Sequence, residues 1–407
     1  MNFIKKLINR KFLLIITILW TLCVTVSRAI RLPNNYAKSH WLLDYRFGFM
    51  KRGFVGSVCS LFTSIFGVTI TSQAITVLSS IVYAAFIIFF LTLIFILLKK
   101  YNYDRNISVL VLVFVSSPFF VMSGHLFGYF DALLFVAAIS SLFLIEKKHF
   151  LSAALISSMA ILVHESYLLI GLPVIYLSIY LKYFQDRKWK LGKVDTLIML
   201  LPVMTFLFLT LYGIVFVDNV TLFGQLLEYL NSYDYIYAGK KGLPYWQTIG
   251  FPELLKTQKH TILERIFQLK NITAYYPVAL AILLFIHSSF KLKVFRLHSL
   301  LVVSVIFAPF LMYAVAFDVI RISLNILGVG FIVLWLMKVT RKSEYFDSPF
   351  MLVGISVLLI NIFSRVILMD RQIDGFSDVQ RAIFYLPAIF YVIFLVFRKE
   401  KEEITSS

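Results

Sequence analysis

The sequence predicts an all-α membrane protein, a polytopic helix bundle with about twelve transmembrane helices (range about 10–13) and interfacial helices in its outer loops. The first observation is composition, because 60% of residues are hydrophobic, 15% are charged, and the mean hydropathy is +0.86. Soluble domains are about half apolar and about a quarter charged, so an ordinary soluble enzyme is excluded. The second is a series of long apolar segments without the sustained alternation of a membrane β-barrel.

Apolar segments recur along the whole chain, with short polar or basic turns between them. A helix needs roughly 20 apolar residues to cross the hydrocarbon core of a bilayer. The predicted spans are residues 12–30, 74–98, 107–124, 132–146, 149–164, 166–181, 196–217, 275–290, 298–317, 319–337, 349–369 and 382–397.

The first predicted span follows a basic start, which favours an uncleaved helix with its amino end in the cytoplasm. A cleaved signal peptide is the alternative, but Ser27-Arg28-Ala29 is a poor cleavage site. The net charge of +18 is distributed as short basic clusters between spans. That pattern sets membrane topology and argues against nucleic-acid binding. With about twelve spans, both termini are predicted to be cytoplasmic.

Four regions follow from this layout. Residues 1–217 form a membrane module whose outer loops carry most candidate site residues, and residues 218–274 form an extracytoplasmic loop. Residues 275–397 supply the C-terminal transmembrane helices, and 398–407 form a cytoplasmic tail. The loop 218–274 is rich in Tyr, whose side chains suit both sugar rings and the membrane interface.

The first predicted outer loop is unusually basic for that side of the membrane, which indicates a bound anion. Asp44 lies among aromatic residues in this loop, and residues 54–72 have the moderate hydropathy of a helix lying along the interface. The alternative for Asp44 is an ion pair that only folds the loop. The basic residues of the loop are Arg28, Arg31, Lys38, Arg46, Lys51 and Arg52.

Two further outer turns contain ionisable residues. The turn GHLFGYFD holds His125 and Asp131, and the turn VHES holds His164 and Glu165. Ionisable groups at membrane depth are costly, which makes them functional candidates. The alternatives are that Asp131 caps its helix, that His164 and Glu165 bond to neighbouring helices, and that His125 faces water.

Two arginines near the outer ends of later spans complete the candidate set. Arg321 and Arg365 need anionic partners, because a guanidinium near membrane depth is costly to leave unpaired. A phosphate group would serve, and salt bridges to neighbouring aspartates are the alternative.

The sequence motifs indicate no resident cofactor. Cys23 and Cys59 cannot form a metal cluster, and the chain has no HExxH motif. No phosphate-binding glycine loop or GxSxG motif is present. A divalent cation bridging Asp44 or Asp131 to a phosphate is left open.

The layout of residues 1–217 resembles the GT-C superfamily of integral-membrane glycosyltransferases, which use polyprenyl-phosphate-linked sugars. That family has a long first outer loop with a catalytic acid and interfacial helices, then a second outer loop that often carries another acid. Asp44 and Asp131 occupy those places here. The chain departs from the pattern of many members because Asp44 has no adjacent acid, its motif being Asp-Tyr-Arg.

A second resemblance is to the O-antigen and capsule repeat-unit polymerases, with 218–274 as the large outer loop. It implies that arginines hold a diphosphate-linked glycan, and the candidates are Arg46, Arg52, Arg321 and Arg365. Both resemblances imply a multi-pass protein of the bacterial cytoplasmic (inner) membrane that acts in cell-surface polysaccharide biosynthesis. A lipid-linked glycan or solute transporter is the alternative from another class, although no matching halves are evident.

The expected reaction is glycosyl transfer from an undecaprenyl-(di)phosphate-linked donor to a glycan acceptor at the outer membrane face. Asp44 is the first candidate for the base, and Asp131, Glu165 and His164 are the further catalytic candidates. Cationic groups would hold the donor phosphate. These are Arg46, Lys51, Arg52, His125, Arg321 and Arg365. Membrane lipids are the other expected partner.

Overall fold

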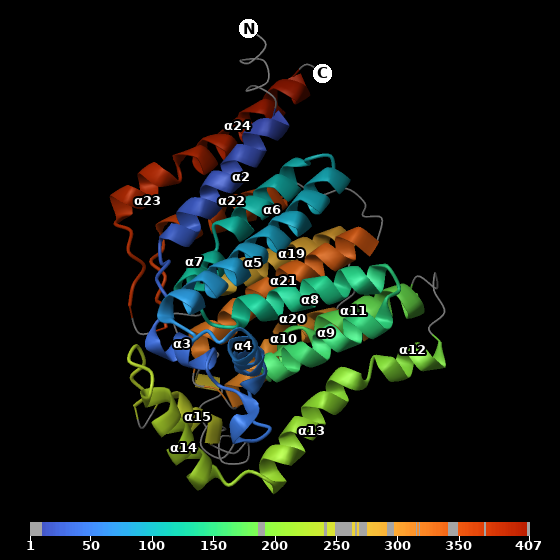
Figure 1. Cartoon of the computed structure of the whole chain (residues 1–407). Helices are drawn as coiled ribbons and strands as arrows, with labels where there is room; N and C mark the ends of the chain where they lie inside the picture. Colours follow the sequence, from blue (N-terminus) through green and yellow to red (C-terminus); the bar gives the residue numbers. More distant parts are fainter. Residues whose placement is uncertain are drawn as a thin grey trace.

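The computed structural model is helical throughout the part of the chain that it describes, apart from one antiparallel bridge between Ile367 and Ile373. The described residues are 10–185, 192–239, 242–248, 263–264, 267, 275–290, 297–314, 316, 318–340, 349–369 and 372–404. Both ends of the described chain lie at the same end of the molecule (Figure 1).

The helices, in chain order and with their bounds, are α2 (Arg10–Ser27), α3 (Asn35–His40), η1 (Tyr45–Phe47), α4 (Gly53–Phe66), α5 (Ser72–Lys100), α6 (Arg105–Val115), α7 (Pro118–His125), α8 (Asp131–Glu146), α9 (Phe150–Val163), α10 (Tyr167–Ile170), α11 (Leu172–Tyr180), η2 (Leu181–Gln185), α12 (Lys193–Ile198), α13 (Leu201–Val215), α14 (Asn219–Asn231), α15 (Leu243–Thr248), α19 (Tyr276–Phe290), α20 (Leu297–Phe307), η4 (Ala308–Ala314), α21 (Val319–Thr340), α22 (Pro349–Phe363), α23 (Asp378–Phe384) and α24 (Leu386–Ile404).

Six helical segments among the described residues are long and apolar enough to cross a membrane, or seven if the bent pair α23–α24 counts as one span. Each predicted span overlaps a helix, but the predicted number of about twelve is not confirmed. The difference is one of length. Helix α9 has 14 residues and α22 has 15, so at about 1.5 Å per residue each is shorter than a ~30 Å hydrocarbon core.

The core is formed by the segments Arg105–His125 and Val319–Lys338, whose apolar windows are fully buried. Phenylalanine rings join them, and Phe114 stacks on Phe331 with centroids 3.8 Å apart. Gly328 makes this packing feasible, because a Cβ there would lie 2.5 Å from the rings of Phe119 and Phe135. Helices α2, α5, α19, α20 and α22 pack around these two segments.

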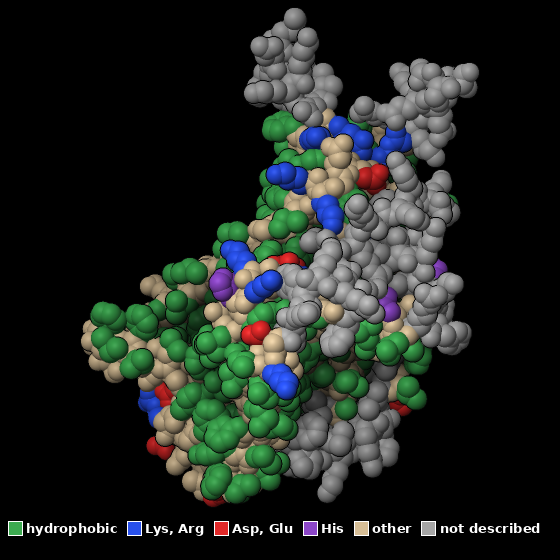
Figure 2. Space-filling model, turned by 90° about the vertical axis from the view of Figure 1, so that its right-hand side faces the viewer, with side chains coloured by type: hydrophobic (Ala, Val, Ile, Leu, Met, Phe, Trp, Pro, Cys, Tyr) green, Lys and Arg blue, Asp and Glu red, His purple; other side chains and the backbone are tan. Residues whose placement is uncertain are grey.

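The outside of the bundle is strongly apolar, as a lipid-facing surface is. Helices α5 and α13 expose many large hydrophobic side chains, and Figure 2 shows such side chains over much of one face. Lys and Arg side chains gather near the end that bears the chain termini. These features are compatible with a multi-pass membrane protein.

Helix α4 lies where the sequence predicts an interfacial helix at 54–72. Its exposed face is apolar and includes Leu61, Phe62 and Ile65. Its other face packs tightly on the first loop, because a Cβ on Gly56 would lie 1.9 Å from the Leu43 carbonyl oxygen. The helix is therefore anchored on one side and exposed on the other.

The predicted loop 218–274 is described only in part. Helices α14 and α15 lie beside α3, at the end of the bundle away from the chain termini (Figure 1). The Tyr235 hydroxyl donates to the Ile70 carbonyl over 2.7 Å and ties this segment to the loop after α4. The predicted tail 398–407 is the continuation of α24 as far as Ile404, and residues 405–407 lie outside the described residues.

Candidate functional site

The first ion pair of the site joins the start of α4 to the turn after α9. Arg52 donates to both carboxylate oxygens of Glu165, over 3.1 Å from Nε and 2.5 Å from Nη2. This fork geometry fixes the two planar groups relative to one another. Arg52 has φ 61, in the left-handed region that residues other than glycine rarely adopt. The guanidinium is thus held by an uncommon backbone conformation at the N-cap of α4.

The second ion pair joins the start of α21 to the start of α8. Arg321 Nε donates to Asp131 Oδ1 over 2.7 Å, and both side chains are less than a tenth exposed. The guanidinium also lies 5.7 Å from the centroid of the Tyr129 ring and 3.8 Å from Asp318. Asp131 is the first residue of α8, as the capping alternative expects. Its carboxylate nevertheless pairs with Arg321, 190 positions away along the chain, a partner that neither sequence alternative named.

His164 connects the two ion pairs. Helix α9 ends at Val163, and His164 is extended, with φ −162. Its Nε2 lies 3.4 Å from Arg321 Nη2, and its Nδ1 lies 2.8 Å from Ser166 Oγ and 3.6 Å from Glu165 Oε2. Both ring nitrogens face donors, because the Ser166 amide donates to Nδ1 over 3.2 Å and the Arg321 guanidinium lies against Nε2. A neutral imidazole can accept at one of them only. We call Arg52, Asp131, His164, Glu165 and Arg321 the charged cluster.

Charge states within the cluster follow from its contacts. Burial opposes ionisation of Glu165, but Arg52 and the other nearby cations outweigh it and hold the pKa of this carboxyl well below its usual range. Burial and the neighbouring Arg52 lower the pKa of His164 far enough to keep it neutral. Burial also lowers the pKa of Lys51, next to Arg52. The site thus contains two salt bridges with a neutral imidazole between them.

Asp44 and Arg46 form a separate pair. The Asp44 carboxylate caps η1 by accepting from the Arg46 amide over 3.0 Å, and it accepts from Arg46 Nε over 2.8 Å. The Arg46 guanidinium lies 4.6 Å from the centroid of the Tyr229 ring on α14. Among the described residues no hydrogen bond or ion pair joins this pair to the charged cluster. Its geometry matches the loop-folding alternative, and the role of Asp44 as base stays a prediction.

Two further candidates also lie outside the charged cluster. His125 is 1% exposed at the end of α7, where its carbonyl accepts from Arg31 Nε over 3.0 Å. Arg365 is 59% exposed and lies 3.3 Å from Asp378. The structure thus groups five of the candidate residues, with Lys51 next in sequence to Arg52, and leaves Asp44, Arg46, His125 and Arg365 apart.

Sequence reasoning missed His40, which lies close enough to Arg52, Arg321 and Glu165 for their charges to affect its pKa. His40 ends α3, is 2% exposed, and has aromatic neighbours. The signal that marks His125 and His164, an ionisable residue beside an apolar stretch in an outer loop, applies equally to His40 and would have found it.

A second buried ionic cluster, also missed, lies between α2, α22 and α23. Asp374 binds Arg381 and lies 2.8 Å from Arg28, and all three side chains are 0% exposed. Arg28 also donates to the carbonyls of Asn361 and Ser364. We call Arg28, Asp374 and Arg381 the buried triad. Its contacts are those of a structural clamp.

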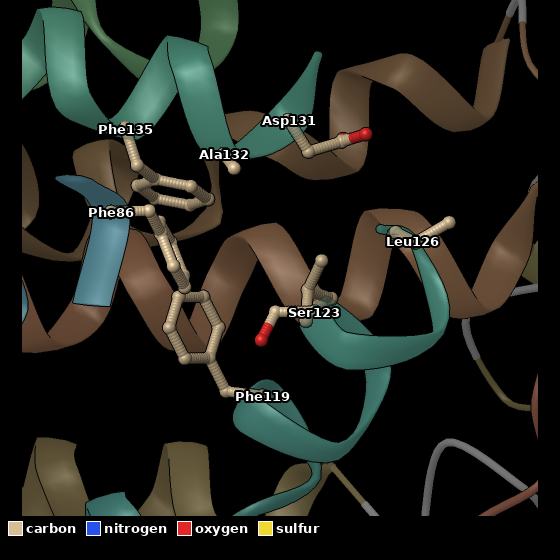
Figure 3. A pocket seen from close by; sticks show the side chains of 8 residues that line it. Phe86, Phe119, Ser123, Leu126, Asp131, Ala132 and Phe135 are labelled. Atoms are coloured by element: carbon tan, nitrogen blue, oxygen red, sulfur yellow. The ribbon is translucent and has the colours of Figure 1, made fainter. Parts of the chain in front are cut away.

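A small cavity lies next to Asp131 of the charged cluster, but its lining is mostly apolar. Phe86, Phe119 and Phe135 line it, together with Ser123 and Asp131. Figure 3 shows the Asp131 carboxyl directed away from the phenylalanine rings. The cavity is therefore a gap in the apolar core. The described residues contain no group of three or more His, Cys, Asp or Glu side chains that could hold a metal ion.

Comparisons with known proteins return no match. No protein-family model fits the chain, and no curated protein or solved structure is similar to it. The function is therefore argued from the geometry of the site and from the sequence pattern.

Proposed function

We propose that this protein is a membrane glycosyltransferase that uses a polyprenyl-(di)phosphate-linked sugar, with the charged cluster as its reaction centre. The observation that carries the proposal is the convergence of Arg52, Glu165, His164, Arg321 and Asp131 from three outer turns and the start of α21. Transfer from a lipid phosphate needs a cation for the leaving phosphate and an acceptor for the hydroxyl proton. Both kinds of group are present within one connected set.

The guanidinium groups would hold the donor phosphate. Arg52 and Arg321 are the two arginines of the cluster, and guanidinium suits the planar, bidentate recognition of phosphate oxygens. Lys51 adds a further cation beside Arg52. As the bond from the anomeric carbon to phosphate breaks, the phosphate leaves with the electron pair, and these cations stabilise its growing charge.

Glu165 is the candidate base on this geometry. Its side chain is 31% exposed, more than that of Asp131 at 6%. In the structure Arg52 keeps its pKa low, which makes it a weak base. A donor phosphate would compete for Arg52, and the pKa of Glu165 would then rise toward its ordinary value. Donor binding would thus prepare the carboxylate to accept the proton of the acceptor hydroxyl as that oxygen bonds to the anomeric carbon.

The apolar surroundings suit a lipid-linked substrate. Helices α4, α5 and α13 expose long apolar faces to the bilayer, and α4 begins at Arg52. A polyprenyl chain lying in the membrane would therefore present its phosphate to the site from the lipid side. The proposed location is the outer face of the bacterial cytoplasmic membrane, in cell-surface polysaccharide synthesis.

The polysaccharide of a deletion strain tests the proposal and separates its two forms. Uniform loss of one sugar branch indicates a single-sugar transferase. Loss of long chains with one repeat unit retained indicates a repeat-unit polymerase. An unchanged polysaccharide, in a strain that normally makes the protein, would contradict both forms.

A further inference from the structure

His40 is a buried side chain whose ring nitrogens have no hydrogen-bond partner among the described residues. It is 2% exposed, and neither ring nitrogen makes a hydrogen bond to any described residue. Buried polar groups in folded proteins are bonded in the large majority of cases, so an imidazole with both nitrogens unmet calls for an explanation. A ligand that bonds to both nitrogens would supply one.

The ring lies against aromatic side chains. Its centroid is 5.0 Å from that of Tyr36, 5.8 Å from that of Phe130 and 6.3 Å from that of Tyr129. Tyr36 and Tyr129 are themselves stacked, with centroids 6.0 Å apart. An aromatic wall beside a polar group suits a sugar, whose ring has apolar C–H faces and polar hydroxyl edges.

His40 is neutral in this setting. Burial lowers its pKa well below the usual value, and Arg52 and Arg321 lower it further, against the weaker effect of Glu165. A neutral imidazole has one nitrogen that donates and one that accepts. Because so low a pKa makes a poor base, the ring is suited to recognising hydroxyls rather than to removing a proton.

Helix α15 supplies a second such side chain. Gln247 is 5% exposed, and neither its amide oxygen nor its amide nitrogen has a partner among the described residues. Helix α15 packs against α3, which carries His40. Two adjoining helices thus each bury one polar side chain that forms no hydrogen bond with the part of the chain that the structure describes.

We propose that His40 and Gln247, with Tyr36 and Tyr129, form the subsite for the acceptor sugar, between α3 and α15. Neighbouring hydroxyls bond to the two nitrogens of His40 and to the Gln247 amide, and a C–H face of the sugar rests on a tyrosine ring. The subsite is closed in this structure, and α15 moves off α3 to admit the glycan. This inference rests on the proposed function, because it places the acceptor beside the charged cluster that would bind the donor.

The test is His40→Phe in the full-length protein, expressed in the deletion strain. An apolar ring in place of an unsatisfied imidazole should leave the Tm unchanged or higher. The polysaccharide should nevertheless be lost. Gln247→Leu should behave in the same way and serves as the second variant if His40→Phe fails to fold. His149→Phe, an exposed histidine at the N-cap of α9, is the matched control and should keep the product.

Binding of undecaprenyl phosphate to the purified protein in detergent separates acceptor from donor. His40→Phe and Gln247→Leu should bind this lipid as the wild type does. Arg52→Ala should bind it about tenfold more weakly or worse, since a charge-assisted contact is lost. Loss of lipid binding in both subsite variants would overturn the acceptor assignment.

Product at the wild-type level per molecule in both subsite variants would also overturn the inference. If Glu165→Gln and Arg52→Ala lose product while both subsite variants keep it, only the acceptor subsite is wrong. If Glu165→Gln and Arg52→Ala themselves keep product, the proposed function is wrong, and the acceptor subsite, which depends on that function, is wrong as well.

Discussion

The buried triad and the charged cluster use the same kinds of residue but differ in how completely their carboxylates are satisfied. In the triad, Asp374 accepts from Arg28, Arg381 and the Val366 amide, and its side chain is fully buried. In the charged cluster, Asp131 Oδ2 has no hydrogen-bond partner among the described residues, and the Glu165 side chain is 31% exposed. Both oxygens of the triad carboxylate accept hydrogen bonds, whereas the carboxylates of the cluster can still accept further ones. A carboxylate with all its hydrogen bonds made indicates a structural role. A carboxylate that can accept further hydrogen bonds indicates a site to which a ligand binds.

The largest effect on folding is expected in the triad. Asp374→Ala would leave Arg28 and Arg381 buried without their shared carboxylate, which costs about 3–5 kcal/mol. Thermal unfolding of the purified protein measures this loss. The control is Asp378→Ala, whose side chain is 66% exposed, and it should cost about 0–1 kcal/mol. If Asp374→Ala and Asp378→Ala are equally stable, the triad does not stabilise the fold, and its proposed structural role, which distinguishes it from the cluster, is wrong.

A similar loss is expected when one partner is removed from the buried pair Arg321–Asp131. Arg321→Met leaves the Asp131 carboxylate uncompensated and should destabilise the fold by about 3–5 kcal/mol. Replacing both residues, as Arg321→Met with Asp131→Leu, should recover most of that stability while the product stays absent. Recovery of product in the double variant would show that the pair is structural, like the triad.

A large effect on activity with little effect on folding is expected at Glu165. Glu165→Gln should lower transfer by about 10²–10⁴-fold, the usual contribution of a general base, and should lower the Tm much less than Asp374→Ala does. Glu146 is the matched control, because it is also ion-paired, with Lys182, and 32% exposed. Glu146→Gln should keep full activity. Equal losses in both variants would point to a general need for charge rather than to a base.

A smaller effect is expected at Asp44. Asp44→Asn keeps the side-chain oxygen that caps η1 but loses the charge that pairs with Arg46. The expected result is near-normal product with a small fall in Tm. Complete loss of product at normal protein level would restore Asp44 as the base, the role that the sequence pattern predicts for it.

The smallest effect concerns pH. Because Arg52 lowers the pKa of Glu165 in the folded protein, the pair stabilises the fold above the unfolded pKa of about 4.3. That contribution is lost as the pH falls below this value, through the lower pKa of the folded state. The Tm difference between wild type and Glu165→Gln should therefore be constant near neutral pH and shrink in acid. A difference that grows in acid would contradict the ion pair.

The apolar helices could be predicted from the sequence, but the number of spans could not, nor could helices α14 and α15 within the predicted loop 218–274. Every predicted apolar segment overlaps a helix of the structure. Some of these helices, such as α9 with 14 residues, are too short to be counted as membrane spans. Hydropathy reports how apolar a segment is. It does not report where the neighbouring turn interrupts the helix, as at the extended His164 after Val163.

The site could be predicted in its residue types and only partly in its pairing. Ionisable residues in predicted outer turns pointed to Arg52, His164, Glu165 and Arg321. The partner of Arg321 is 190 positions away along the chain, and only the packing of α21 against its neighbours brings it to Asp131. His40 has the same local signal as His125 and His164, an ionisable residue beside an apolar stretch, but the sequence does not show that both of its ring nitrogens lack a partner among the described residues.

Direct transfer by purified protein tests the central claim. The protein, reconstituted in vesicles with polyprenyl-linked sugars extracted from the source cells, should move labelled sugar onto glycan without any added nucleotide. Glu165→Gln should be slower by about 10²-fold or more. Transfer at the same rate by wild type and Glu165→Gln, or no transfer by the wild type with donor and acceptor both present, would contradict the proposed reaction centre.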